Sequence, residues 1–108
     1  MYEYKAIVVD VHDGDTVTVD IDLGLSVWAR GVKIRLAGIN APELPTPEGV
    51  AAAKRLNDLV FGKAVNVITA KDRKEKYGRY VGEIFSADGG HVNALMVQEG
   101  HAVWSSTE

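Results

Sequence analysis

The chain has no cysteine, which excludes a disulfide framework and a zinc site built on thiolates. Its hydrophobic runs are all shorter than the ~20 residues of a membrane span, and residues 1–5 lack the apolar segment of a signal peptide. We therefore expect no membrane partner and a cytoplasmic location, with secretion only if a leader was removed. Proline is also scarce: all three prolines lie between residues 42 and 47, where we expect the chain to change conformation.

A large excess of one charge is missing as well. The net charge is −3, whereas proteins that bind nucleic acid without sequence preference usually have a basic surface. The basic residues are nevertheless clustered, because residues 71–79 hold five of them against two acidic residues. Arg30, Lys33 and Arg35 form a second basic group. The charge pattern therefore leaves nucleic-acid binding open.

The first third of the chain alternates with the period of a β-strand. Apolar and β-branched side chains recur at alternate positions over residues 6–11, 16–21 and 32–36, which predicts three strands. Between the first two, residues 12–15 predict a turn in which Gly14 is free to take a positive φ.

A helix and two further strands are predicted next. Thr46 is a suitable N-cap with Pro47 at the first helical position, and Gly62 can end the helix. Residues 64–69 and 79–85 predict strands, residues 92–100 predict a short helix, and residues 101–104 a last short strand. This order favours one domain over residues 1–108, mainly β with α (α+β). We expect a five-stranded Greek-key barrel of OB type, with one helix between strands three and four and a short helix after strand five.

Three separated segments carry side chains that could perform chemistry. Asp13-Gly14-Asp15-Thr16 offers carboxylates, residues 35–43 offer an arginine, an amide and a glutamate, and Tyr77-Gly78-Arg79 offers a second arginine. Taken singly, an Asp-Gly pair between strands is most often a turn, and a basic run is most often a solvated loop. Together they supply oxygen ligands for a hard cation and guanidinium groups that bind two phosphate oxygens at once.

In order and spacing, these segments resemble the staphylococcal nuclease (thermonuclease) family. Residues 13–16 are similar to its Asp-Gly-Asp-Thr motif, residues 35–43 to its arginine, acidic residue and Pro-Glu pair, and residues 76–79 to its Lys-Tyr-Gly-Arg. The resemblance continues through residues 88–95 to Gly100. It implies an OB-type barrel and a calcium-dependent nuclease that cuts single-stranded or flexible DNA and RNA with little sequence preference and leaves 3′-phosphate ends. No obligate protein partner is evident.

The resemblance also implies roles for individual residues. Asp15 and Asn40 would hold the cation through side-chain oxygens, with help from the backbone oxygen of Ala41. Arg35 and Arg79 would bind the phosphate, and Glu43 would act as the general base or orient the attacking water. The expected substrate-binding residues are Tyr77, Lys76 and Lys74.

The chain departs from the family pattern at two places. Asn40 stands where the family usually carries an aspartate, and the lost negative charge predicts a weaker or differently selective metal site, with manganese or another divalent ion as the alternative to calcium. Loss of catalysis is the competing interpretation. Trp104 lies in a segment where the family prototype has tyrosine; it could stack on a base, although packing in the core or at an edge is more common.

Two other functions remain open at this stage. One is a non-catalytic OB module that binds single-stranded nucleic acid, and the other is a purely structural barrel. The joint presence of Arg35, Glu43 and Arg79 favours the enzyme, because a binding module does not need all three together.

Overall fold

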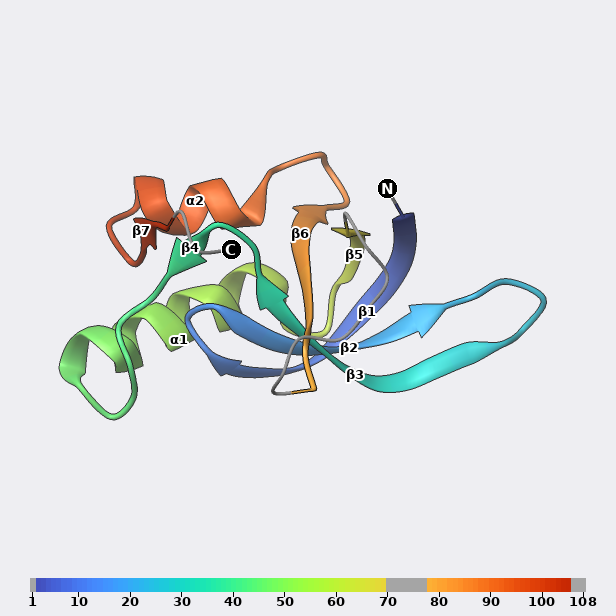
Figure 1. The fold of residues 1–108 in the computed structure, drawn as a ribbon, viewed down its shortest axis with the longest axis horizontal. Coiled ribbons are helices and arrows are strands. Elements are labelled where there is room, and N and C mark those ends of the chain that lie inside the picture. The colour runs from blue at the N-terminus through green and yellow to red at the C-terminus, as the bar shows by residue number, and fades with distance from the viewer. Residues whose placement is uncertain (1, 70–77, 106–108) are drawn as a thin grey trace.

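The computed structural model describes residues 2–69 and 78–105. Five strands close a barrel in the order β1-β2-β3-β6-β5 (Figure 1). They are β1 (Tyr2–Asp13), β2 (Thr16–Asp22), β3 (Trp28–Leu36), β5 (Ala64–Thr69) and β6 (Tyr80–Ser86). Neighbouring strands are antiparallel except β3 and β6, which are parallel. The predicted α+β class and the five-stranded OB-type barrel are confirmed.

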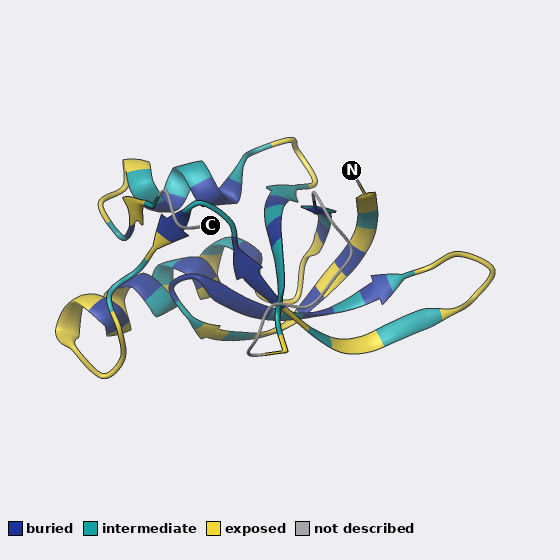
Figure 2. Cartoon of the chain, viewed as in Figure 1, coloured by how far each residue is buried: buried dark blue, intermediate teal, exposed yellow. Residues whose placement is uncertain are grey.

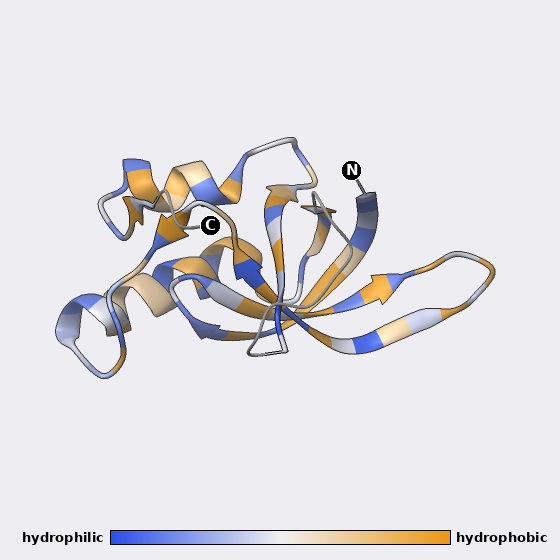
Figure 3. Cartoon of the chain, in the orientation of Figure 1, coloured by the Kyte–Doolittle hydropathy of each residue, from blue (hydrophilic) through white to orange (hydrophobic). Residues whose placement is uncertain are grey.

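The barrel core is built from alternate positions of its strands. On β2, Val17, Val19 and Ile21 are buried, while Thr18 and Asp20 between them are partly exposed. Inward positions of the other strands are also buried and mainly hydrophobic (Figures 2 and 3), although Ile7 and Val9 on β1 are exposed. A one-residue shift in register would turn these valines to solvent, so the hydrophobic pattern sets the register.

Two helices cover one end of the barrel. Helix α1 (Pro47–Val60) begins at Thr46, whose hydroxyl accepts a hydrogen bond from the Gly49 amide at 3.0 Å, as the N-cap prediction requires. It packs against β1 through Ala52, Leu56 and Val60. Helix α2 (Val92–Gln98) follows β6 and lies against it. No helix in the described ranges is both long enough and apolar enough to cross a bilayer.

A second, two-stranded sheet joins distant parts of the chain. Strand β4 (Ile39–Asn40) pairs antiparallel with β7 (Val103–Trp104), so that Asn40 lies opposite Val103. The expected short strand near the C-terminus is therefore present. Trp104 is 61% exposed on this strand, so it does not pack in the core.

The β2–β3 hairpin is longer than the sequence pattern predicted, because β3 begins at Trp28. Asp20 extends the ladder: its carboxylate accepts hydrogen bonds from the Gly31 amide and the Arg30 guanidinium, both at 2.9 Å. These bonds lower the pKa of Asp20, with the Gly31 amide as the largest cause. The hairpin projects away from the barrel at the end opposite α1 (Figure 1).

Candidate active site

Asp15 is fixed at the start of β2 through both its backbone and its side chain. Its backbone amide donates to Asp13 Oδ1 at 3.1 Å, and its carbonyl accepts from the Leu36 amide at 2.7 Å. The side-chain Oδ2 accepts from the Ala41 amide at 2.9 Å, and Oδ1 accepts from the Thr16 hydroxyl at 3.2 Å. Asp15 is only 8% exposed, so the carboxylate is aimed by the fold.

Gly14 brings this turn close to its neighbours by being small. A Cβ atom at this position would lie 2.6 Å from the Cβ of Ala41 and 2.7 Å from that of Ala52. Gly14 does not take a positive φ, so the conformational reason expected from the sequence is wrong. Glycine is needed at this position because α1 and the segment after β4 both pack against the turn. This close packing brings the Asp15 carboxylate to the Ala41 amide.

Arg35 lies beside Asp15 at the end of β3. Its Nη2 donates to Asn40 Oδ1 at 2.6 Å and lies 3.5 Å from Asp15 Oδ2, while Nη1 donates to the Leu36 carbonyl at 2.7 Å. The residue is 6% exposed, although it alternates with the core residues of β3. The structure therefore brings together the side chains of Asp15, Arg35 and Asn40, which the sequence placed in two separate segments.

The electrostatics of Asp15 follow from this enclosure. Burial is the largest cause that raises the pKa of Asp15, and the adjacent Asp13 raises it further. The hydrogen bond from the Ala41 amide and the charge of Arg35 act in the opposite direction. Two acidic residues next to each other in a partly buried site make a position where additional positive charge is favourable.

Glu43 is held through its backbone and exposes its side chain. Its carbonyl accepts hydrogen bonds from the Thr46 amide at 3.2 Å and the Thr46 hydroxyl at 2.6 Å. A methyl group on Gly49 would overlap this same carbonyl, so the first turn of α1 is pressed against it. The carboxylate of Glu43 thus stands in solvent beside a rigid backbone, on the segment that follows Asn40 and Ala41.

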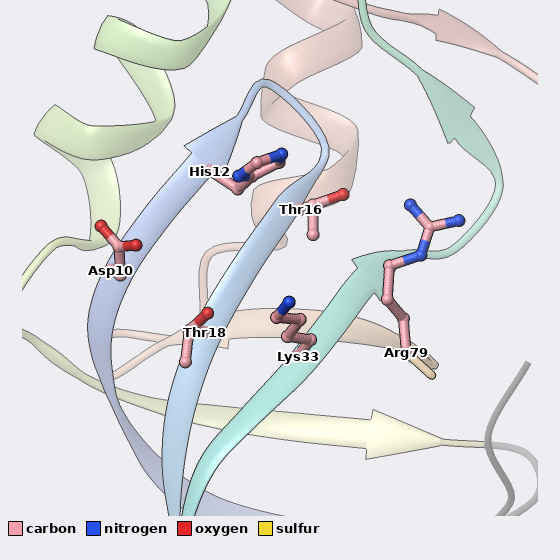
Figure 4. A pocket seen from close by; sticks show the side chains of 6 residues that line it. All are labelled: Asp10, His12, Thr16, Thr18, Lys33 and Arg79. Carbon is pink, nitrogen blue, oxygen red and sulfur yellow. The ribbon is translucent and has the colours of Figure 1, made fainter. Parts of the chain in front are cut away.

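The other predicted residues divide into two groups. Arg79 precedes β6, is partly buried, and lines a groove on the outer face of β2 and β3 (Figure 4). Lys74, Lys76 and Tyr77, the expected substrate-binding residues, lie outside the described residues.

Asn93 is a structural residue that the sequence analysis did not single out. It is fully buried at the start of α2, where its Oδ1 accepts from the Ile84 amide at 3.0 Å. Its Nδ2 donates to the carbonyls of Ala37 at 2.9 Å and Gly82 at 3.4 Å. The side chain therefore ties α2 to β6 and to the turn between Arg35 and Asn40. An asparagine on the apolar side of a short helix was the available signal.

Comparison with known proteins identifies the family to which the chain is similar. The family model described as "Staphylococcal nuclease homologue" matches residues 33–108. A micrococcal nuclease of Shigella flexneri is 36% identical over 108 residues, covering 93% of this chain and 58% of that protein. An uncharacterized endonuclease of Escherichia coli is 38% identical over 97 residues, covering 90% of this chain and 58% of the relative.

The chain belongs to the staphylococcal nuclease family. It spans a little over half the length of these bacterial relatives. A staphylococcal-like nuclease of Arabidopsis thaliana is also similar, at 37% identity over 76 residues, which cover 70% of this chain and 23% of the plant protein.

The donor set of this staphylococcal nuclease homologue can be tested against a divalent cation. All three predicted ligands offer oxygen, which suits a hard ion such as calcium. The side-chain oxygens of Asp15 and Asn40 already converge on one positive group, Nη2 of Arg35. Among the described residues, however, no group of three or more acidic, histidine or cysteine side chains is placed to hold a metal. The site therefore fits a hard cation by ligand type and supplies it with little negative charge.

Proposed function

We propose that this chain hydrolyses phosphodiester bonds in single-stranded or flexible DNA and RNA, with little sequence preference, in a reaction that depends on a divalent cation and leaves 3′-phosphate ends. Family membership supports a nuclease. The observation that carries the proposal is the meeting of the Arg35 guanidinium with Asp15 and Asn40, within 3.5 Å, at the end of β3.

Arg35 and Arg79 bind the phosphate in this proposal. A guanidinium group offers two parallel N–H donors to two phosphate oxygens, and it stays charged at any physiological pH. Arg35 is already oriented by its bonds to Leu36 and Asn40, so little reorganisation is required when charge develops on the phosphate. The bond to Asn40 is with a neutral amide, so exchanging it for a charged phosphate oxygen is favourable.

Glu43 is the proposed general base. Its side chain is exposed, so water reaches it, and its backbone is fixed by Thr46 and by the close approach of Gly49. A carboxylate held in this way accepts a proton from the attacking water or orients that water toward phosphorus.

Asp15, Asn40 and the carbonyl of Ala41 are the residues that would hold the cation. When bound, a divalent ion of this kind polarises the phosphate oxygens and offsets the charge of the transition state. Calcium is the first candidate because all the ligands are oxygens, and manganese or another divalent ion is the alternative because Asn40 removes one negative charge.

The experiment is degradation of single-stranded DNA with added calcium, beside an EDTA control. Glu43→Gln is the test variant and Glu3→Gln is its matched control, because Glu3 is exposed at the end of β1 remote from Asp13. We expect calcium-dependent cutting by the wild type and Glu3→Gln, and none by Glu43→Gln. Equal cutting by both variants would refute Glu43 as the base.

A non-catalytic nucleic-acid-binding module is the second candidate, and Asn40 is the observation that favours it. That function predicts DNA binding without cutting in all three proteins. In that case Asn40→Asp, which restores a carboxylate beside Asp15, is the variant in which to look for activity.

A further inference from the structure

The outer face of β1, β2 and β3 carries a polar groove from which the proposed reaction uses only Arg79. The groove has a volume of about 480 Å³, within the range of pockets that hold small ligands. It is lined by Asp10, His12, Thr16, Thr18, Lys33 and Arg79. Figure 4 shows Lys33 and Arg79 toward one side of it and Asp10 toward the other.

The strand register places this groove directly beside the candidate active site. Thr16 lies opposite Arg35, and Thr18 lies opposite Lys33, in the pairing of β2 with β3. The two pairs form adjacent rows on the same sheet face, separated by two residues along each strand, or about 6.7 Å. Thr16 belongs to both places, since it lines the groove and its hydroxyl bonds to Asp15.

The chemistry of the groove suits a phosphate and its nucleoside. Lys33 is exposed on β3 beside Thr18 of β2, while Arg79 adds a second cation from the segment before β6. A lysine and an arginine next to a hydroxyl donor match a phosphodiester oxygen. Asp10, the β1 partner of Thr18 on the side of the groove away from Lys33, can accept a hydrogen bond, which matches a sugar hydroxyl or a base amino group.

We propose that this groove is a second phosphate subsite, in which Lys33 and Thr18 bind the phosphodiester next to the one that is cut. The inference rests on the proposed function, because Arg35 must bind the scissile phosphate for the groove to receive its neighbour. The substrate strand runs along β2 and β3, from the row of Arg35 to the row of Lys33. The enzyme therefore favours chains with several phosphates over a substrate that has only one.

The first test compares hydrolysis of a dT octamer with that of TpT, a dinucleoside monophosphate that has a single phosphodiester. The variants are Lys33→Gln, Thr18→Val and Lys33→Arg, with Lys54→Gln as the control, because Lys54 is exposed on α1 and its side chain is paired with Asp58. We expect Lys33→Gln to lose about tenfold in kcat/KM on the octamer, mainly through KM, and much less on TpT. Thr18→Val should show the same selectivity to a smaller extent, and Lys33→Arg should retain the preference for the octamer.

The second test measures binding of a fluorescent dT octamer in EDTA as a function of salt. Losing one phosphate contact lowers the slope of log K against log salt by about 0.7 for a single strand. Lys33→Gln should show that decrease, and Lys54→Gln should match the wild type. Equal slopes in the two variants, no measurable binding by the wild type, or equal losses on TpT and the octamer would overturn the subsite.

The two proposals fail in different ways. If no protein cuts DNA, the nuclease function is wrong and the subsite beside a scissile phosphate falls with it, and a lowered salt slope in Lys33→Gln then shows a phosphate contact of a binding module. If cutting depends on Glu43 but Lys33→Gln behaves like Lys54→Gln in both assays, the nuclease stands and the subsite is wrong.

Discussion

Replacing Asn93 by alanine should cost this protein a large share of its stability. The substitution removes three hydrogen bonds, to the amide of Ile84 and to the carbonyls of Ala37 and Gly82. Gly82 keeps another partner, because its carbonyl also accepts from the Ala37 amide at 2.8 Å. The Ile84 amide and the Ala37 carbonyl are left without these bonds.

The magnitude follows from those two groups. Leaving a buried polar group unpaired costs about 1–3 kcal/mol, so two of them together cost about 2–6 kcal/mol. The free energy of unfolding of a domain of this size is about 5–15 kcal/mol, so the variant loses a substantial fraction of it.

Urea denaturation followed by far-UV circular dichroism at neutral pH measures this loss. With a slope of about 2 kcal/mol per molar urea, the midpoint should fall by about 1–3 M. Asn57→Ala is the matched control, because Asn57 is exposed on α1, and its midpoint should change by less than ~0.3 M. A loss below about 1 kcal/mol in Asn93→Ala would show that the three hydrogen bonds do not hold α2 to the barrel.

Four further predictions concern the site and the hairpin. Gly14→Ala forces a methyl group against α1 and Ala41, so we expect a loss of about 1–3 kcal/mol in urea and weaker activity; an unchanged midpoint would contradict the close packing. Arg79→Lys should lower kcat about a hundredfold, because an ammonium group cannot bind two phosphate oxygens in one plane, and near-full activity would rule out this role. Asn40→Asp should raise calcium affinity in a calorimetric titration, and no gain would remove the explanation based on ligand charge. Asp20→Asn should lower the urea midpoint at neutral pH. Because the pKa of Asp20 is lowered in the folded state, the difference in stability between the variant and the wild type should narrow as the pH falls below the ordinary aspartate pKa. A difference that stays constant with pH would contradict the hydrogen-bonded carboxylate.

The barrel was predictable because its signals are local. Alternating valines on β2 and the N-cap at Thr46 each reflect a preference of a few adjacent residues, and the structure has both. The motif segments were recognisable for the same reason, since each is short and contiguous. The meeting of Asp15 with Arg35 and Asn40 was implied only by the resemblance to a family.

The remaining features depend on contacts between distant residues. The turn at Gly14 was predicted correctly, but the reason given for the glycine, a positive φ, was wrong. The actual reason is the close packing of Gly14 against Ala41 and Ala52, which depends on three segments that are distant in the sequence. The hydrogen bond from Arg35 to Asn40 was hidden as well, since strand alternation places Arg35 outward but does not indicate what covers it. The groove around Lys33 arises because β1, β2, β3 and the segment before β6 meet, and a pattern within one strand does not show which side chains of the others lie beside it.

The pairing of β4 with β7 has a consequence for the order in which the molecule becomes functional. Asn40 and Val103 are 63 residues apart, and the strand that carries Asn40 has only this partner ladder among the described residues. The pairing of β1 with β5 that closes the barrel spans a similar separation, 67 residues between Tyr2 and Thr69. Both contacts close a long loop, so we expect them to form after the local β1–β2 and β2–β3 hairpins. In a refolding chain the segment bearing Asn40 and Ala41 should therefore be secured late, like the closure of the barrel. In a Trp28→Phe background, Trp104 on β7 provides a fluorescence reporter for this pairing, and the onset of hydrolysis should follow its signal and not the earlier circular dichroism of the hairpins.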